Sequence, residues 1–399
     1  FKVIYICDTI SPMEKLIYMD NSATTKIHPD VLKEMLPYLS EKYGNPSSIY
    51  SIGRESKKAL DSARERVSKA LNSNPNEIFF TNGGTESDNW AIKGIAFANE
   101  SKGKHIISTN IEHHAVLHTL TYLEKNGFEI TYLPVKENGI IDIKDLEKEI
   151  RKDTILISVM FANNEIGTIQ PIKEIGEIAH KKGIYFHTDA VQAVGNIPID
   201  VEDLNIDLLS LSAHKINGPK GVGALYIRKG VNISNMLHGG GQEMKRRAGT
   251  ENVAGIVGLG KAIEINTKDI EKKSKYLIEL RDYFIERILK TVPDTILNGD
   301  PTLRLPGNIN VCFKYIEGES ILLMLDIKGI CASSGSACTS GSLEPSHVLL
   351  ALGLPHEIAH GSLRLTLSEE NTKDDMDYVL ETVPPIIEKL RAMSPLIKK

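Results

Sequence analysis

Cysteine is scarce in this sequence, which places only four among 399 residues: Cys7, Cys312, Cys331 and Cys338. So few thiols in so long a chain do not form a disulfide framework, and no CxxC pair suggests a zinc or iron site. The scarcity indicates a reducing compartment. A disulfide or a shared metal ion between Cys331 and Cys338 is a minor alternative that the sequence leaves open.

Long apolar runs and an excess of positive charge are also missing. No apolar stretch approaches the roughly 20 residues that span a bilayer. The formal net charge of -5 argues against nucleic acid or an anionic membrane as the main partner. The short apolar start FKVIYIC is followed at once by Asp8, so we expect no secretory signal, and we expect residues 1–12 to be an extension ahead of Met13. A soluble cytoplasmic protein is expected.

Between about residues 75 and 230, short apolar runs alternate with amphipathic stretches. The strand-like runs are HIIST, FEITYLPV, TILISVMF, GIYFHTDA, DLLSLSA and VGALYIR. This alternation predicts an α/β fold with a large, mostly parallel sheet. One helix is predicted to open at Pro171 and to close at Gly183, and one long charged helix is predicted from about Gly258 to Lys290. A weaker α+β pattern follows, which indicates a second, smaller domain.

Ligands of such sheets bind beyond the carboxyl ends of the strands, so polar residues there are candidates. In TNGGTESDN, Gly83, Gly84 and Thr85 lie at the start of a helix, where free amides and a hydroxyl suit a phosphate. The alternative is a simple glycine-rich turn with Thr85 as the N-cap.

Two further strand ends carry polar residues. Asp189 and Gln192 suit a protonated ring nitrogen and a ring hydroxyl, although a capping aspartate with a surface glutamine is the alternative. Ser212, His214 and Lys215 follow the next strand, and a lysine leaving a buried strand can act as an amine nucleophile, whereas a solvated loop lysine is the alternative. Together with the phosphate cradle, these groups meet the requirements of pyridoxal phosphate.

The stretch ASSGSACTSGSLEPS places Cys338 among small polar residues instead of apolar neighbours. Such a composition predicts a water-accessible loop, in which a thiol is exposed to oxidation. Cys338 is therefore a candidate nucleophile. Pro345 is predicted to open the first turn of a helix that ends before Gly353.

Eight motifs occur in a characteristic order between Tyr18 and Arg364: YGNPSS, TNGGTESDN, EHHAV, NNEIG, HTDAVQ, SAHK, RRAGTEN and SSGSACTSGSLEPSH. In these motifs the chain resembles the NifS/IscS-type cysteine desulfurases of group I, in the class V aminotransferase group of pyridoxal-phosphate enzymes, and GSLEPSH favours the NifS branch. The resemblance implies the type I pyridoxal-phosphate fold, similar to aspartate aminotransferase. The large domain is expected at residues 28–262, and residues 13–27 and 263–399 are expected to form the small domain with the cysteine loop at about 332–344.

The resemblance also implies roles for single residues. Lys215 is implied to be the Schiff-base lysine and general base, Asp189 the partner of the pyridine nitrogen, and Gln192 the partner of the ring hydroxyl. His113 is implied to stack on the ring and to assist proton transfer, whereas the neighbouring His114 is expected to be a surface histidine.

The remaining roles concern the phosphate and the substrate. The implied phosphate ligands are Gly84, Thr85, Ser212 and His214. Thr250 resembles the residue by which a partner subunit completes the phosphate site, which implies a homodimer. Asn164 and Arg364 are implied to hold the substrate, because a guanidinium fork fits an amino-acid carboxylate, and Asn164 is implied to bind the cofactor as well. Tyr50 stands where the family pattern has a histidine, which leaves any role of that position open.

The implied reaction converts L-cysteine to L-alanine, with a persulfide formed on Cys338 and passed to an iron–sulfur scaffold protein. Nitrogenase service, general iron–sulfur assembly and tRNA thiolation remain open as pathways. Another pyridoxal-phosphate enzyme of this fold, a selenocysteine lyase or an aminotransferase, is the first alternative. The second is a non-catalytic scaffold-binding protein that has kept the fold.

Overall fold

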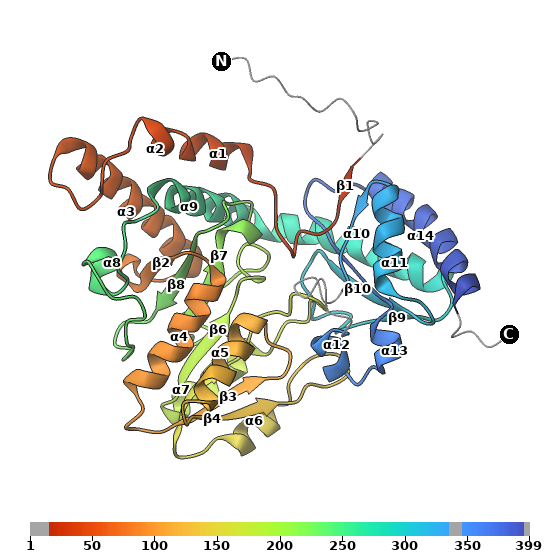
Figure 1. Cartoon of the computed structure of the whole chain (residues 1–399), viewed down its shortest axis with the longest axis horizontal. Coiled ribbons are helices and arrows are strands. Elements are labelled where there is room, and N and C mark those ends of the chain that lie inside the picture. Colours follow the sequence, from red (N-terminus) through yellow and green to blue (C-terminus); the bar gives the residue numbers. More distant parts are fainter. Residues whose placement is uncertain (1–15, 335–344, 395–399) are drawn as a thin grey trace.

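The computed structural model describes residues 16–334 and 345–394. Figure 1 shows two halves side by side, each built around its own sheet. The sheet of the larger half has seven strands, which are β2 (Ile78–Thr81), β3 (His105–Thr109), β4 (Glu129–Leu133), β5 (Thr154–Ser158), β6 (Tyr185–Asp189), β7 (Leu208–Ser212) and β8 (Gly223–Ile227).

The strand order of this sheet is β2-β8-β7-β6-β5-β3-β4. Strand β8 runs antiparallel to both of its neighbours, and the other pairings are parallel. Six strands therefore share one direction, and their carboxyl ends meet at one edge of the sheet. This confirms the predicted α/β fold with a mostly parallel sheet, and it places the polar residues that follow β2, β6 and β7 at the same edge.

Helices cover both faces of the large sheet (Figure 1). The helices of the larger half are α1 (Pro29–Met35), α2 (Pro37–Ser40), α3 (Ser51–Leu71), α4 (Gly84–Ala98), α5 (His114–Glu124), α6 (Ile143–Glu149), α7 (Ile172–Lys182), α8 (Gln242–Lys245) and α9 (Val253–Lys268), with one-turn helices η1 (Pro75–Glu77) and η2 (Ala213–Lys215). Phe186 of β6 packs in the core that also holds α3, α7 and α9. Leu156 and Leu208 pack on the opposite face with α4 and α5. Because side chains alternate along a strand, His187 and Asp189 lie on the α4 face.

The smaller half packs helices against a three-stranded sheet of order β12-β10-β9. Its elements are α10 (Ile270–Thr291), β9 (Thr295–Leu297), β10 (Asn308–Phe313), α11 (Gly318–Ile327), β11 (Ile330–Cys331), α12 (His347–Ala351), α13 (His356–Ala359), β12 (Ser362–Thr366) and α14 (Lys373–Met393). The first strand, β1 (Ile17–Tyr18), pairs with β11, so the start of the described chain belongs to this half. The residue boundaries predicted for the two domains stay predictions.

Two predicted helices differ from the structure in detail. The long helix expected from Gly258 to Lys290 is wrong, because Asp269 leaves the helical conformation and separates α9 from α10. Helix α7 ends at Gly183, whose left-handed backbone closes it as predicted, but Pro171 is its N-cap. Likewise, Ser346 is the N-cap of α12, so Pro345 precedes that helix instead of opening its first turn.

The outer edge of β2 is covered by a buried ion pair. Arg64 of α3 donates to the carbonyl oxygen of Ile78, and the Glu243 carboxylate accepts the N–H of Phe80 at 2.8 Å. The guanidinium and the carboxylate also bind each other through two hydrogen bonds of 2.8 and 2.9 Å. The pair thus takes the hydrogen-bonding place of a neighbouring strand.

Three successive residues of α8 have left-handed backbone: Glu243, Met244 and Lys245, with φ of 43°, 55° and 66°. This conformation costs a non-glycine residue roughly 1–2 kcal/mol. The buried Arg64–Glu243 pair holds the segment in this shape, just ahead of Thr250.

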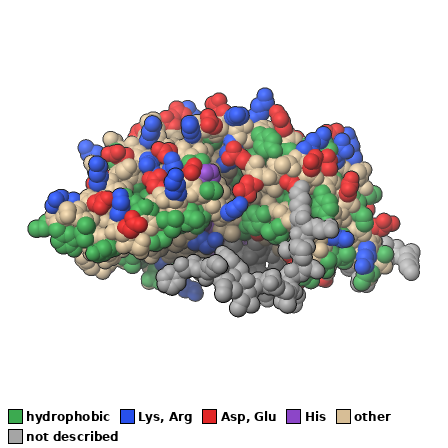
Figure 2. Space-filling model, turned by 90° about the horizontal axis from the view of Figure 1, so that it is seen from above, with side chains coloured by type: hydrophobic (Ala, Val, Ile, Leu, Met, Phe, Trp, Pro, Cys, Tyr) green, Lys and Arg blue, Asp and Glu red, His purple; other side chains and the backbone are tan. Residues whose placement is uncertain are grey.

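Acidic and basic side chains alternate on the surface. Figure 2, seen from the side on which α1 and α2 lie, shows both signs interspersed. Among residues 16–334 and 345–394, no helix has both the length and the apolar character that crossing a bilayer requires.

Helices α3 and α9 approach closely at Gly260, where an added Cβ would lie 2.7 Å from the Cα of Ala63. We expect Gly260→Val to lower the free energy of unfolding by about 1–3 kcal/mol, because the helices must separate. Lys261→Val introduces the same side chain next to it on a partly exposed position and is expected to change stability by no more than about 0.5 kcal/mol. Urea unfolding of both variants tests this. Equal losses of unfolding free energy in the two variants would contradict the close approach of α3 and α9.

Candidate active site

A cavity of about 720 Å³ lies where β2 ends and α4 begins. Its lining residues are Ala23, Thr24, Asn82, Gly83, Gly84, Thr85, Glu86, Asn89, Ser212, His214, Lys220, Gly221 and Met236. Gly83 is the N-cap of α4 and has a φ of 143°, which favours glycine. A Cβ there would lie 3.8 Å from Ser212 Oγ, so a side chain would enter the cavity. The alternative that Thr85 is the N-cap is wrong, because Gly83 takes that position.

The charges of this cavity suit a phosphate. His214 Nδ1 lies 3.2 Å from Thr24 Oγ1. Burial, and next the charges of Lys215 and Lys220, lower the pKa of His214 to about 4, so the ring is neutral at pH 7. Lys220 and the positive end of α4 therefore supply the favourable charge, while the hydroxyls and main-chain N–H groups supply donors.

Lys215 lies in η2, directly after β7, in reach of the N-terminal segment. Its Nζ donates to the carbonyl oxygen of Ser22 and, at 2.8 Å, to that of Ala23. Gln192 Nε2 donates to the same Ser22 oxygen at 3.0 Å. The structure thus brings together Lys215 and Gln192, which share the lining of a small cavity of about 50 Å³.

Asp189 ends β6 and is 6% exposed. Its Oδ1 accepts the N–H of Val191 at 2.9 Å. Burial raises the pKa of Asp189 to about 6, against the opposing effects of that N–H and of the Lys215 charge. A buried carboxylate that is ionised at neutral pH suits a cationic ring nitrogen.

His113 is the N-cap of α5, and its Nδ1 accepts the N–H of Ala115 at 3.1 Å. A neutral imidazole that accepts at Nδ1 carries its hydrogen on Nε2. Burial, then Lys215, lowers the pKa of His113 to about 4, so this tautomer persists at neutral pH. His113 also lines a third cavity, which it shares with Thr85 and Asn89, so it lies beside the phosphate cradle.

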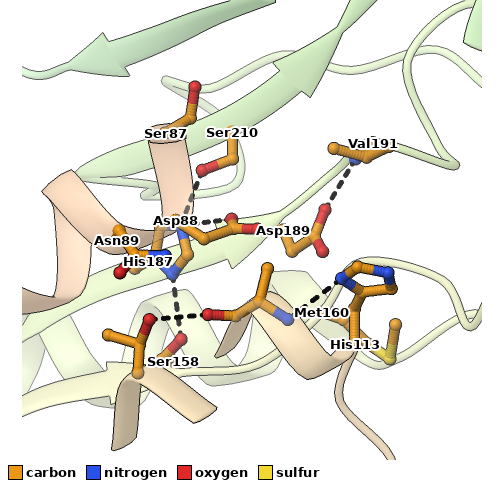
Figure 3. A network of polar contacts seen from close by, with 12 residues as sticks. Ser87, Asp88, Asn89, His113, Ser158, Met160, His187, Asp189, Val191 and Ser210 are labelled. Carbon is orange, nitrogen blue, oxygen red and sulfur yellow. Dashed lines mark hydrogen bonds and ion pairs between the residues drawn. The ribbon is translucent and has the colours of Figure 1, made fainter. Parts of the chain in front are cut away.

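Figure 3 shows the polar groups that lie between α4 and the strands beneath it. The carboxyl of Asp88 is 1% exposed, and its Oδ1 lies 3.6 Å from Nε2 of His187. His187 lies between two hydroxyls, Ser158 Oγ at 2.9 Å from Nδ1 and Ser210 Oγ at 3.0 Å from Nε2. None of these groups was predicted from the sequence.

Glu112 is a further buried acid beside this network. Its Oε1 accepts hydrogen bonds from Thr109 Oγ1 at 2.7 Å and from the N–H of Met160 at 2.9 Å. Its Oε2 has no hydrogen-bond partner within the described part of the chain. Burial raises the pKa of Glu112 to about 8, so the group is largely protonated at neutral pH.

Arg364 of β12 is 2% exposed and binds two oxygens. Its Nη2 donates to Asp20 Oδ1 at 2.9 Å, and its Nη1 donates to the main-chain oxygen of Asn164 at 3.1 Å. Nε has no partner among the described residues. A buried guanidinium with an unused donor suits a carboxylate ligand. The structure therefore brings Asn164 and Arg364 together, and their roles toward the substrate stay predictions.

Comparison with known proteins agrees with this arrangement. The aminotransferase class-V family profile matches residues 17–379. The chain is 65% identical over 392 residues to the cysteine desulfurase IscS of Methanosarcina thermophila, which covers 98% of this chain and 97% of the relative. A solved structure named a NifS-like protein has a TM-score of 0.89 at 41% identity and covers 94% of this chain and 100% of that chain. Another, named SspA in complex with cysteine, has a TM-score of 0.80 at 38% identity and covers 89% of this chain and 100% of that chain.

This chain belongs to the class V aminotransferase family. Its curated relatives place it in the cysteine desulfurase branch, and both the IscS and the NifS names occur among its similar proteins. The predicted type I pyridoxal-phosphate fold and the predicted cofactor are thereby confirmed.

The residues of this class V enzyme fit pyridoxal phosphate. The cavity that a Cβ at Gly83 would enter has the size and the donors for the phosphate. Asp189 is the buried carboxylate for the ring nitrogen, and the charge of Lys215 acts on it, which indicates that the amine lies nearby. Nε of Arg364, which has no partner among the described residues, would suit the carboxylate of a substrate.

Three predicted residues of the enzyme fall outside this cluster. Thr250 is exposed and does not line the cradle of its own chain. His114, expected to be a surface histidine, is partly exposed, and its ring also packs 5.0 Å from that of His118 and 4.9 Å from that of His347. Cys338 lies outside the described residues.

The described chain on either side of the Cys338 segment is nevertheless held near Arg364, at one end by Arg364 itself and at the other by Glu165. Ser333 exchanges main-chain hydrogen bonds of 3.1 and 2.7 Å with Arg364. On the other side, Ser346 Oγ donates to the carboxylate of Glu165, which follows Asn164 in the chain. These contacts fix where the segment leaves the described structure and where it returns.

Sequence reasoning missed Asp20, Asp88 and Glu112. A signal for Asp88 exists, since it precedes Ala91 and Ile92 by one helical turn and so lies on the apolar face of α4. The burial of Asp20 and Glu112 arises from distant parts of the chain and leaves no local pattern.

We expect the buried Glu112 to make stability fall as pH rises from about 4.5 to 8. Its pKa is higher in the folded protein than in the unfolded one, so the folded state binds more protons throughout that window. Glu112→Gln keeps the oxygen that accepts from Thr109 and Met160 but cannot titrate. In this variant the free energy of unfolding should therefore change less with pH over the same range. Urea unfolding of cofactor-loaded protein between pH 5 and pH 8 measures it, with Glu381→Gln on an exposed position of α14 as control. A profile as steep as that of the wild type would contradict the role of Glu112.

Proposed function

We propose that this enzyme converts L-cysteine to L-alanine, forms a persulfide on Cys338, and passes the sulfur to an acceptor protein that serves iron–sulfur assembly. The observation that carries this proposal is that Ser333, on one side of the Cys338 segment, hydrogen-bonds to Arg364, and Ser346, on the other side, hydrogen-bonds to Glu165, the neighbour of Asn164. Cys338 is five positions after Ser333, a length of chain that spans at most about 18 Å. The thiol is therefore within reach of a substrate bound at Arg364.

Different residues of the chain bind the substrate, move the proton and hold the cofactor in this reaction. Arg364 binds the substrate carboxylate through its fork, beside Asn164 and Asp20. Lys215 Nζ takes the proton from Cα, and Nε2–H of His113 is a donor on the other side of the cradle. Bound pyridoxal phosphate supplies the electron sink that makes this proton removable, and Asp189 holds its ring nitrogen.

Cys338 then attacks the sulfur of the substrate as a thiolate. The bond between Cβ and sulfur breaks, Cβ gains a proton, and the new bond joins the two sulfur atoms. Cβ is reduced while the two sulfurs reach the persulfide level, so the step balances without an external oxidant. The relatives named cysteine desulfurase and the neighbour named in complex with cysteine support this substrate.

We also propose that the enzyme works as a cytoplasmic homodimer. Thr250 is exposed and lies outside the cradle of its own chain, so it is free to reach the phosphate site of a second copy. The iron–sulfur scaffold as acceptor rests on the family resemblance.

We expect Cys338→Ser to bind cofactor and L-cysteine but to yield neither alanine nor persulfide in a single turnover. Alanine is quantified, and peptide mass spectrometry locates the added sulfur in the wild type. Cys331→Ser, which removes the partly buried thiol of β11, is the matched control and should turn over normally. Alanine release by Cys338→Ser would instead identify a lyase, turnover that depends on a keto acid would identify an aminotransferase, and no turnover by loaded wild type would favour a non-catalytic protein.

We expect Arg364→Lys to raise the KM for L-cysteine by roughly tenfold to a hundredfold, because a lysine cannot offer the planar fork and each charge-assisted hydrogen bond contributes about 1.5–3 kcal/mol. Steady-state kinetics measures this. Arg228→Lys, at the end of β8 with partners such as Glu202, controls for the exchange itself. An unchanged KM with intact secondary structure would remove Arg364 from the substrate site.

A further inference from the structure

Five polar side chains meet between α4 and the strands beneath it. The side chains around them form a hydrophobic core. Neighbouring strands supply four of the five polar side chains at adjacent positions: Ser158, His187, Asp189 and Ser210. Asp88 of α4 faces them, with its Oδ1 3.6 Å from Nε2 of His187 (Figure 3). Water has almost no access, because Asp88 is 1% exposed and His187 is 0% exposed.

A second ionised carboxylate beside Asp189 would repel the negative charge of Asp189. Two like charges in a site that excludes water cannot both ionise without a large shift, so one of them takes up a proton. The groups that face Asp88 are Asp189 and Glu112, both acidic, and the ring of His187. The cation of the site, Lys215, acts on Asp189.

We propose that Asp88 carries a proton and forms a net-neutral pair with His187, so that Asp189 is the carboxylate that keeps its charge behind the ring of the cofactor. Asp88 and His187 are positioning residues in this view, since neither is argued to touch the reacting atoms. The inference rests on the proposed role of Asp189 and extends it.

The contacts of His187 and the burial of both groups support a neutral pair. Both nitrogens of His187 meet hydroxyls, at 2.9 and 3.0 Å, and a hydroxyl can donate to one nitrogen and accept from the other of a neutral ring. Burial lowers the pKa of His187 to about 3. Burial, followed by the charge of Asp189, raises the pKa of Asp88 well above its usual range. A hydrogen bond from Ser210 opposes these effects on the pKa of Asp88, but Asp88 Oδ1 has no hydrogen-bond partner among the described residues, so one oxygen of the carboxyl lacks a donor that would stabilise the anion.

Asp88→Asn tests the charge, because asparagine has nearly the same shape as a protonated aspartic acid and no charge. In the cofactor-loaded protein we expect the pH midpoint of the visible absorption band to move by less than about 0.3 units, and the Kd for pyridoxal phosphate by less than about threefold, because no charge is lost. A fall of the midpoint by about one unit or more would show that Asp88 is ionised and would overturn the proposal.

Infrared difference spectroscopy detects the proton on the Asp88 carboxyl directly. The spectrum of wild type minus Asp88→Asn should contain the band of a protonated carboxyl at pH 7, whereas Asp61→Asn, which removes an exposed carboxylate of α3, should yield carboxylate bands. Carboxylate bands for Asp88 would overturn the proposal. This measurement needs no L-cysteine and no turnover, so a failure of the proposed desulfurase activity would leave it unaffected.

The wild-type protein provides a second measurement in case Asp88→Asn does not fold. The ring resonances of His187, assigned by comparison with His187→Gln, should not titrate between about pH 5 and 8. A protonated His187 in that range would show that the pair is an ion pair with an ionised Asp88, and the proposal would be wrong.

Discussion

The turn that follows Asp20 and leads to Thr25 sets the geometry on which both halves of the active site depend. Its side chain at Asp20 binds Arg364 of the small sheet, and its main-chain oxygen at Ser22 binds Lys215 beside the large sheet. Thr25 Oγ1 donates to the main-chain oxygen of His214 at 2.9 Å. A single stretch of backbone therefore fixes the separation between the group that binds the substrate carboxylate and the amine that takes the proton. A shift of either half is transmitted to both groups.

The site obtains a strong local field from few charges. Buried carboxyls surround it, yet burial raises the pKa of Glu112 to about 8, so that group is largely protonated at neutral pH, and burial also raises the pKa of Asp88 well above its usual range, in line with the proton proposed for it. Burial and nearby cations keep His113 and His214 neutral. The charges that remain act over short distances with little screening by water. Protonated acids and neutral imidazoles thus fill the space with hydrogen-bonding groups without adding charge.

Much of the fold could be predicted from the sequence, because its information is local. Strand β3 coincides with the run HIIST, and the other parallel strands lie within the predicted apolar runs. The break at Asp269 was missed because a helical pattern with good helix formers resumes directly after it, in IEKKSKYLIEL. The sequence motifs predicted that Gly84, Asp189 and Lys215 belong to one pyridoxal-phosphate site. The partner of Arg364, by contrast, lies 344 residues away at Asp20, and such a contact has no periodicity or composition that could reveal it.

The ion pair along β2 has a consequence outside catalysis. The exposed edge of a sheet is a template on which another chain can add a strand. Here Arg64 and Glu243 satisfy the outward main-chain groups of Ile78 and Phe80, so that template is blocked. Loss of either partner leaves a buried charge uncompensated and opens the strand edge in the same event. The first failure of such a variant is aggregation by strand addition, and the protein is lost from solution before its chemistry is affected.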